Sequence, residues 1–450
     1  MSDLPQTYGP VLEPGAEGFD AEVSGYNLLV AHRPALVVGA TGPADVLAAV
    51  RFAAERKLPV AVQATGHGPS VPADGAVFIN TRRMSSVRVV PAARTARIEA
   101  GVRWGKVVHE AAAHGLAPLN GSSPEVGAIA YVLGGGVPML GRRFGYAADH
   151  VRQLDVITAD GQLRHVSADC EPDLFWALRG GKGNHGIVVS LEIDLVPVER
   201  LYGGGMYFSA EATADVLHAY REWVATVPEE MGSSLLLIQM PDLPAVPPPI
   251  RGRYVSHLRI AWSGPIAEGE RWVRPFRALA RPLIDSVRDM PYREVGSIHH
   301  EPTNPVPFLG KNSLLGPLDE GAVNALLEVA GPAAEPAYFV ELRHFGGALS
   351  RPARIPNAIG RRDAEFSLYS GSVVSPERYA SLRSAHETLH ARLSPWGTGA
   401  VCVNFLSGPE VTTEILRSAY LPEDFDRLVA LKKRYDPENM FRINHNIAPA

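Results

Sequence analysis

Cysteine is scarce in this chain of 450 residues, which contains only Cys170 and Cys402. Two cysteines are too few for a disulfide framework, and neither belongs to a C-x-x-C pair. We therefore predict a reduced, buried thiol at each position.

The sequence also lacks runs of lysine or arginine and long apolar stretches. No segment approaches the roughly 18 to 20 apolar residues of a membrane span, and the start, "MSDLPQTYGPVLEPG", has neither the basic nor the apolar region of a signal peptide. With a net charge of -5, these absences argue against nucleic acid or an anionic membrane as the main partner. We expect a soluble, cytoplasmic protein that starts near Met1 and acts on a small molecule.

What the chain does contain is apolar residues, which make up 46% of it and can fill more than one core. Up to about residue 200, predicted strands and helices alternate. Residues 35–38 predict a strand, and a helix with apolar Val46 and Val50 at helical spacing starts at Gly42-Pro43. Residues 60–64 predict the next strand. Asp160-Gly161 joins two β-rich runs, which predicts a hairpin with a type I′ turn.

The pattern changes after residue 200. Polar and apolar residues roughly alternate at 254–262 and 337–345, which predicts antiparallel strands with one buried face. Near residue 396 the chain turns back, with a predicted strand at 400–408 and a helix at 423–437. The terminal "ENMFRINHNIAPA" alternates polar and apolar residues, so we expect it to dock. These elements indicate an α+β protein.

The stretch "LVVGATG" could bind a dinucleotide, because a strand that leads through small residues into a helix can hold a pyrophosphate. The nicotinamide fingerprint requires a third glycine where Asp45 stands. It also requires an acidic residue after the next strand, where this chain has Thr65, Gly66 and His67. The sequence therefore argues against this site.

The stretch "HETLH" matches a zinc-peptidase pattern. His386 and His390 would bind the metal, Glu387 would act as general base, and Glu410 is a conceivable third ligand. Both histidines flank the apolar stripe of the predicted helix at 376–393, which favours a solvated or half-buried helix face.

Four glycine-rich loops offer a third kind of site, at residues 64–68, 121–127, 134–136 and 180–186. Glycine lets a backbone approach a ligand closely and leaves N–H groups free to bind phosphate oxygens. A single loop of this kind is most simply a turn. Four in one lobe indicate one large ligand.

Several ordered motifs resemble FAD-linked oxidases of the berberine bridge enzyme type, which have the vanillyl-alcohol-oxidase fold. The motifs are "VAVQATGHG", "ARIEAGVRWGKV", "GSSPEVGAIAYVLGGGVPMLGRRFGYAADHV", "DLFWALRGGKGNHGIVV" and "YDPENMFRINHNI". The resemblance implies two lobes. Residues 1–199 would form a PCMH-type FAD-binding domain of two α/β subdomains, with its core at about 30–199, and residues 200–395 a substrate domain with an antiparallel sheet covered by helices. Residues 396–450 would return to complete the FAD site.

In that family the histidine of the first glycine loop is bonded to the 8α-methyl group of the flavin, and His67 matches it. Such a bond holds the ring system in place, and an electron-withdrawing imidazole favours hydride uptake. Asparagines on the returning segment and the tail are expected to order the flavin by hydrogen bonds. The other cofactor-binding residues that the resemblance implies are Ala64, Thr65, Gly66, Gly68, Ser122, Ser123, Val126, Gly127, Gly134, Gly135, Gly136, Gly186, Ile187, Asn404, Asn444 and Asn446.

Two departures from the family pattern affect this interpretation. Many relatives carry a second flavin bond from a cysteine in G-x-C-P, but Ser123 stands in its place, so a single covalent link is expected. Relatives often have G-x-G beside the flavin, whereas this chain has Gly136-Val137-Pro138, which bears on how dioxygen is handled.

The resemblance implies hydride transfer to flavin N5 from an alcohol, amine or activated C–H of a small organic molecule, with O2 as final acceptor. By family habit the substrate belongs to secondary metabolism, and the protein is a monomer or homodimer. Glu341 is the first candidate for the residue that takes the substrate proton and Tyr369 the second, while structural roles remain open for both. A zinc peptidase and a flavin-fold protein without catalysis remain as alternatives.

Overall fold

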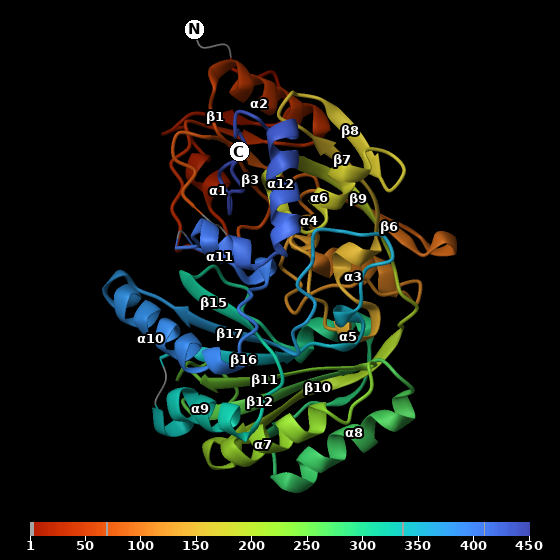
Figure 1. Cartoon of the computed structure of the whole chain (residues 1–450), viewed down its shortest axis with the longest axis vertical. Helices are drawn as coiled ribbons and strands as arrows, with labels where there is room; N and C mark the ends of the chain where they lie inside the picture. Colours follow the sequence, from red (N-terminus) through yellow and green to blue (C-terminus); the bar gives the residue numbers. More distant parts are fainter. Residues whose placement is uncertain (1–3, 69–70, 335–336, 409) are drawn as a thin grey trace.

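The computed structural model describes residues 4–68, 71–334, 337–408 and 410–450. Its strands form sheets of four, five and eight strands. Figure 1 shows the two smaller sheets together in one lobe and the eight-stranded sheet in the other. The predicted α+β class and two-lobed architecture are confirmed.

The four-stranded sheet contains the predicted strand–helix–strand unit. Strands β2 and β3 both pair in parallel with β4, which lies between them, and helix α2 packs over β2 and β4. Buried Val46 and Val50 lie at helical spacing on α2, which explains why this segment folds against the sheet. The elements are β1 (Val11–Leu12), α1 (Phe19–Val23), β2 (Leu36–Gly39), α2 (Pro43–Arg56), β3 (Val60–Gln63) and β4 (Val77–Asn80).

The five-stranded sheet is antiparallel, in the order β5-β6-β9-β7-β8. The predicted hairpin joins β7 to β8, but the type I′ assignment is wrong. Of the two turn residues only Gly161 has a positive φ, at 67°, and its N–H donates to the carbonyl of Thr158. The elements are β5 (Val87–Val90), β6 (Thr95–Glu99), α3 (Trp104–Ala112), α4 (Ala128–Leu133), α5 (Gly141–Phe144), β7 (Val151–Ile157), β8 (Leu163–Ser167), α6 (Pro172–Leu178) and β9 (Ile187–Asp194).

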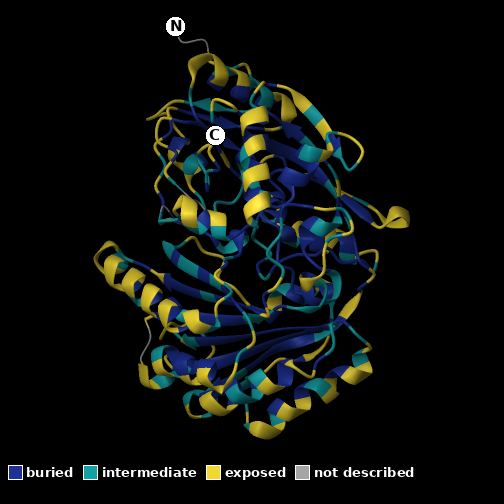
Figure 2. Cartoon of the chain, in the orientation of Figure 1, coloured by how far each residue is buried: buried dark blue, intermediate teal, exposed yellow. Residues whose placement is uncertain are grey.

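The eight-stranded sheet is antiparallel, and α7 to α10 lie on its outer side (Figure 1). The outer faces of these helices are exposed (Figure 2). Its strands are β10 (Arg200–Ser209), β11 (Met231–Gln239), β12 (Tyr254–Trp262), β13 (Ile284–Asp285), β14 (Arg288–Pro291), β15 (Phe308–Leu315), β16 (Phe339–His344) and β17 (Phe366–Val373). The helices are α7 (Thr213–Val224), α8 (Ile266–Leu279), α9 (Glu320–Ala330) and α10 (Tyr379–Arg392).

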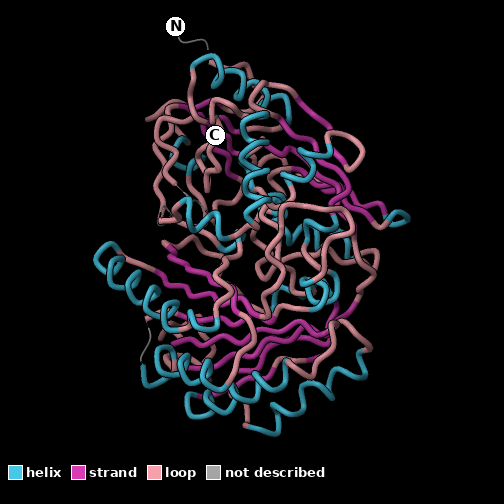
Figure 3. The backbone as a smooth tube through the Cα atoms, in the orientation of Figure 1, coloured by secondary structure: helices cyan, strands magenta, loops and turns pink. Residues whose placement is uncertain are grey.

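The antiparallel prediction for this sheet is confirmed, but the prediction of one buried face is wrong. Every residue of β12 is buried, including Ser256, His257 and Arg259. Helices cover the face that carries Ser256 and Leu258, and the other lobe covers the face that carries His257 and Arg259, so these last two polar side chains point into the junction between lobes. Loops of the first lobe line that junction (Figure 3).

The final segment returns to the first lobe, where α12 (Pro422–Tyr435) packs against α6 and is preceded by α11 (Thr413–Ser418). The predicted strand at 400–408 is wrong: Val403–Phe405 form a 3-10 helix. The carboxylate of Asp436 accepts N–H groups from Met440 and Phe441, so the chain turns into the docked tail. Lys432, fully buried, pairs with Asp436 at 2.5 Å and donates to the carbonyl of Asn184.

Cys402 is buried, as predicted, but Cys170 is exposed, because its turn after β8 faces solvent. Within the described ranges, no helix is long and apolar enough to cross a membrane.

Candidate active site and cofactor cradle

The loop that carries His67 follows β3 and is fixed from the opposite side by residues 25–27. The N–H groups of Tyr26 and Asn27 donate to the carbonyls of Thr65 and Gly66. Gly66 has a φ of 68°, and a Cβ at this position would lie 2.6 Å from the Cα of Gly25. Only glycine satisfies both conditions, so the loop conformation is encoded in these residues.

The His67 ring lies on the ring of Tyr26, with centroids 4.1 Å apart and planes 5° from parallel. Its Nδ1 is 2.9 Å from the hydroxyl of Thr65. Its Nε2 is buried and, among the described residues, has no hydrogen-bond partner. Burial and the nearby Arg103 lower the pKa of His67 to about 4, so the ring is neutral at neutral pH.

The loop at 121–127 lies directly against the His67 loop. The N–H of Gly127 donates to the Thr65 hydroxyl, and a Cβ on Gly127 would lie 3.4 Å from that of Ala64. Ser123 is buried, and its hydroxyl accepts the N–H of Glu125 at 3.3 Å. Ser122 and Val126 lie on the same loop, so the structure brings these two groups of predicted residues together.

The Gly134–Gly136 loop follows α4. Gly136 has a φ of 71°, and any side chain there would collide with the ring of Tyr131 and with Ala147. A side chain at Gly134 would collide with the carboxamide of Asn404. Asn404 therefore reaches this loop from a 3-10 helix and not from the predicted strand.

The 180–186 loop and the tail meet through Asn184. Its side chain donates to the carbonyl of His445 and accepts the N–H of Ile447, and Gly186 and Ile187 follow where β9 begins. At its other edge the tail contacts β3, since the N–H of Val60 donates to the carbonyl of Met440. We call the four loops, Asn404 and residues 440–447 the cofactor cradle.

The cofactor cradle contains buried polar atoms that require a ligand. Besides His67 Nε2, these atoms are Asn444 Oδ1, His445 Nε2 and Asn446 Oδ1 of the cofactor cradle, and Tyr131 Oη on α4, whose ring lies beside Gly121 and Gly136. The described chain supplies none of them with a hydrogen-bond partner. Because buried polar groups are normally paired, this set fits a large cofactor with several hydrogen-bonding groups.

Lys182 also belongs to the cofactor cradle, although it is not among the residues predicted from the sequence. It has a φ of 56°, unusual for lysine, and lies beside Gly134, Cys402 and His445. Burial lowers its pKa to about 8. The sequence "GGKGNHG" does not single out this lysine, because its left-handed conformation is visible only in the structure.

The second part of the site is the face of the eight-stranded sheet that points toward the cofactor cradle. Ser234 on β11 is in register with Arg259 on β12 and with Arg343 on β16. In the next row, Glu341 is opposite Tyr369 on β17. Directly paired residues share a face, so the side chains of these two rows lie together on the face toward the cofactor cradle. Their apolar neighbours in the strands, Leu235, Leu258 and Leu342, point to the other face and join the core under the helices.

Glu341 lies in an ion cluster. Its Oε1 is 2.9 Å from Arg259 Nη1, and its Oε2 is 3.0 Å from Arg343 Nη2. Nε2 of His299 lies 3.6 Å from Oε1. Burial alone would raise the pKa of Glu341, but the charge of Arg343, the nearby His299 ring and the charge of Arg259 hold it well below its usual value. The carboxylate is therefore ionised.

Tyr369 lies among the rings of Phe308, Phe339 and Phe405. Burial raises the pKa of its phenol, which is protonated at neutral pH. The guanidinium of Arg343 lies 5.5 Å from the centre of the Phe405 ring. Arg343 therefore connects the sheet to the segment that carries Asn404.

The start of α2 is closed by the chain itself. The carboxylate of Asp45 accepts the N–H groups of Tyr8, Gly9 and Thr41 at 2.7, 3.2 and 2.8 Å. Thr41 belongs to "LVVGATG", so an N–H group that a pyrophosphate would bind in this loop already has an acceptor. This geometry agrees with the sequence argument against a nicotinamide site.

The "HETLH" histidines are buried, so the prediction of a solvated or half-buried face is wrong. The hydroxyl of Ser370 lies 2.6 Å from His386 Nδ1 and 3.0 Å from His390 Nε2, which ties α10 to β17. Glu387 pairs with Arg383 on the exposed side of the helix. In the part of the chain that the structure describes, no cluster of His, Cys, Asp or Glu could hold a metal.

Comparison with known proteins agrees with this geometry. Residues 34–167 match the family described as FAD binding domain, and residues 410–448 match the family described as Berberine and berberine like. The (R)-6-hydroxynicotine oxidase of Paenarthrobacter nicotinovorans is 31% identical over 466 residues, which cover 98% of this chain and 97% of that protein. The chain belongs to the FAD-linked oxidases of the berberine bridge enzyme type.

Solved structures of FAD-linked oxidases agree. The crystal structure of 6-hydroxy-D-nicotine oxidase from Arthrobacter nicotinovorans matches with a TM-score of 0.86 and 27% identity over 100% of both chains. Wild-type BBE-like 1 of Physcomitrella patens, 20% identical over 98% of this chain and 97% of that chain, shares the fold with a TM-score of 0.83. As a berberine-type FAD-linked oxidase, the protein is an FAD-dependent oxidoreductase, and the orphaned polar atoms of its cofactor cradle fit FAD.

Proposed function

We propose that this protein is a covalent flavoprotein oxidase in which residues 1–199 and 396–450 hold FAD and residues 200–395 hold the substrate. The substrate is a small alcohol, amine or activated C–H compound, and by family habit one of secondary metabolism. When bound, FAD takes a hydride at N5, and O2 then takes up the two electrons and two protons to give H2O2.

The observation that carries the proposal is the state of His67. Its Nδ1 contacts Thr65, while Nε2 is buried, neutral and, among the described residues, unpartnered. Nε2 is therefore the ring atom that we propose to bond the flavin 8α-methyl group. Ser123 has no thiol, so His67 is the single attachment point.

The site also offers residues for the substrate. A carbon that gives up a hydride must lose a proton from its oxygen or nitrogen, and ionised Glu341 can accept it. Protonated Tyr369, opposite Glu341 in register, can donate a hydrogen bond to the same group. We propose these roles for the two residues, in line with the family resemblance.

The attachment is tested by acid precipitation of the purified protein. We expect a yellow pellet from the wild type and from His109→Ala, which removes an exposed histidine on α3, and a colourless pellet from His67→Ala. Peptide mapping by mass spectrometry should find flavin on the peptide that contains His67 and none on the one that contains Ser123. A colourless wild-type pellet with stoichiometric zinc would contradict the proposal, and turnover with H2O2 release excludes a binding protein without catalysis.

A further inference from the structure

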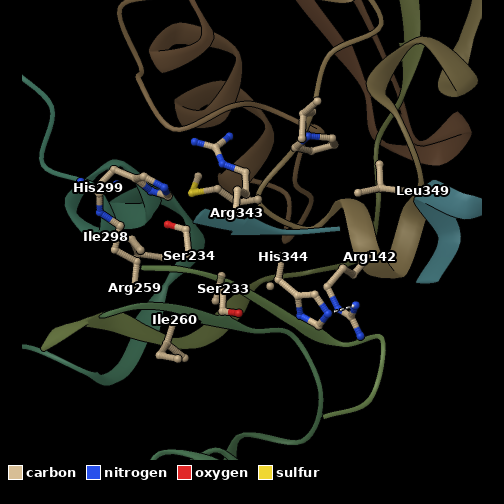
Figure 4. Close-up of a pocket in the computed structure, with 15 residues that line it drawn as sticks. Arg142, Ser233, Ser234, Arg259, Ile260, Ile298, His299, Arg343, His344 and Leu349 are labelled. Carbon is tan, nitrogen blue, oxygen red and sulfur yellow. Dashed lines mark hydrogen bonds between the residues drawn. The ribbon is translucent and has the colours of Figure 1, made fainter. Parts of the chain in front are cut away.

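We propose that this enzyme binds its substrate through an anionic oxygen group, a carboxylate or a phosphate, held between Arg259 and Arg343 over Ser234. The site is the pocket between the eight-stranded sheet and residues 137–139 of the first lobe (Figure 4). The inference rests on the function proposed above and narrows its substrate class.

The register of the sheet places the two arginines on either side of Ser234. Arg259 and Arg343 each pair with Ser234 from a neighbouring strand, so their backbones lie about 9.5 Å apart, twice the spacing between strands. Such a separation allows two guanidinium groups to approach one small anion from opposite sides.

Both arginines keep N–H groups for a ligand. A guanidinium has five donors. Within the described ranges, Arg343 donates only to Glu341, and Arg259 donates to Glu341 and to Nδ1 of His257. Arg142 also lines the pocket, but its N–H groups are used within the protein. They donate to the carbonyls of Met231, Val227 and Phe345, so Arg142 holds the backbone and is not a ligand-binding arginine in this proposal.

Positive charge is in excess at this point. Two buried guanidinium groups face the single carboxylate of Glu341. Burial, Arg259 and Arg343 keep His299 neutral with a pKa of about 3, and burial with Arg259 lowers the pKa of His257 well below its usual value. Glu301, a second carboxylate that acts on Arg343, is exposed. A buried excess charge is costly, and an anionic ligand would offset that cost.

Two further polar side chains complete the anion site. Ser234 Oγ and both ring nitrogens of His299 are buried and find no hydrogen-bond partner in the described chain. Figure 4 shows Ser234 on the same side of the sheet as Arg343 and His299, whereas Ile260 points to the other side. A serine hydroxyl and a histidine N–H are donors that carboxylate and phosphate oxygens accept.

The rest of the pocket is apolar. Met139, Ile298 and Leu349 are buried residues of its lining. The pocket therefore fits a molecule with one anionic oxygen group and an apolar remainder, which carries the bond to be oxidised.

The test measures binding to the holoenzyme by calorimetry at constant ionic strength, and by the change in visible absorbance of the flavin. The probes are benzoate, its neutral isostere benzamide, the cation benzylammonium and phenyl phosphate. We expect at least one of the two anions to bind tenfold or more tightly than benzamide, with benzylammonium weakest. The stronger of benzoate and phenyl phosphate identifies the preferred anion.

Arg343→Gln should weaken binding of the preferred anion tenfold or more and leave benzamide unchanged. Arg288→Gln, the same substitution at an exposed, paired arginine of this sheet, should change neither. If Arg343→Gln does not fold, Ser234→Ala tests the same site and should weaken anion binding threefold or more.

The proposal is overturned if neither anion binds more tightly than benzamide, or if Arg343→Gln and Arg288→Gln bind the preferred anion equally. The flavin content is measured beforehand by visible absorbance. Protein that contains flavin but shows no anion preference would overturn only the anion site, whereas protein without flavin would contradict the proposed function. Calorimetry reports anion binding whether or not the protein contains flavin.

Discussion

The imidazole of His67 and the phenol of Tyr26 are stacked almost parallel, 4.1 Å apart, and the Tyr26 hydroxyl donates to the carbonyl of Pro302 in the other lobe. The ring to which we assign the flavin bond is thus oriented by a residue that contacts both lobes. Its orientation does not depend on the glycine loop alone.

Loss of this stacking should reduce flavin attachment. Aromatic pairs contribute roughly 0.5–1.5 kcal/mol beyond their buried area, so Tyr26→Leu should lower the fraction of covalent flavin several-fold in the acid-precipitated protein. Tyr26→Phe keeps the ring and should retain nearly full attachment. Equal attachment in Tyr26→Leu and the wild type would show that the stacking is not needed.

Glu341→Gln should reveal two effects. It leaves Arg259 and Arg343 without their carboxylate, and breaking a buried ion pair costs about 3–5 kcal/mol, which denaturant unfolding would measure. If Glu341 also accepts the substrate proton, the fall of kcat/KM toward acid pH should disappear in the variant. A pH profile of unchanged shape would restrict Glu341 to positioning the arginines.

Tyr369→Phe separates the hydroxyl from the ring. The ring packs with Phe308, Phe339 and Phe405 in both proteins, so stability should change little. Loss of a hydrogen bond to the reacting group should lower kcat, by about 10² to 10⁴-fold if Tyr369 transfers a proton. Unchanged kcat with the same KM would exclude Tyr369 from the reaction.

The charge of Lys182 should be visible in the flavin spectrum. With a pKa lowered to about 8, the side chain loses its proton as the pH rises through that value, and the charge beside the cofactor disappears. The phosphates of FAD would shift this pKa upward, so we expect a spectral change with a midpoint at or above pH 8 in the wild type. Lys182→Met should lack it, and identical titrations would contradict the placement.

The hydroxyl of Ser370 is within hydrogen-bond distance of two buried histidines, His386 and His390, so Ser370→Ala should destabilise the protein. Leaving buried nitrogens unpaired costs roughly 1–3 kcal/mol, measured as the free energy of unfolding. Ser384→Ala, on the exposed side of α10, is the matched control and should change it little. Added zinc should stabilise neither variant nor the wild type, whereas stabilisation lost in His386→Ala would support a metal site.

Much of the fold follows from sequence pattern. Val46 and Val50 at helical spacing predicted α2 correctly, and strands of the large sheet were found from their alternation. The same alternation misled the prediction for β12, because Arg259 and His257 face the other lobe and not water, and one strand cannot show what covers it. At 400–408 local β-propensity suggested a strand, but tertiary contacts, including the Cys402 N–H to Asn312, hold a 3-10 turn.

Of the candidate site, too, only part could be predicted from the sequence. His67 and the glycine loops could be predicted because close backbone approach and left-handed φ values both favour glycine, which is visible in the sequence. The row formed by Arg259, Ser234 and Arg343 could not, because its members come from three strands and are brought together only by register. Lys182 and Tyr131 were overlooked because a single lysine or tyrosine among glycines has no distinctive spacing.

The order in which the cofactor cradle is translated has a biosynthetic consequence. His67 leaves the ribosome early, but its partners on the tail follow only after the whole eight-stranded sheet has been made. The buried pair of Lys432 and Asp436 then fixes the tail against the 180–186 loop. A nascent chain therefore presents the histidine long before it can hold a flavin, so the attachment that we propose at His67 has to follow the synthesis and docking of residues 440–447.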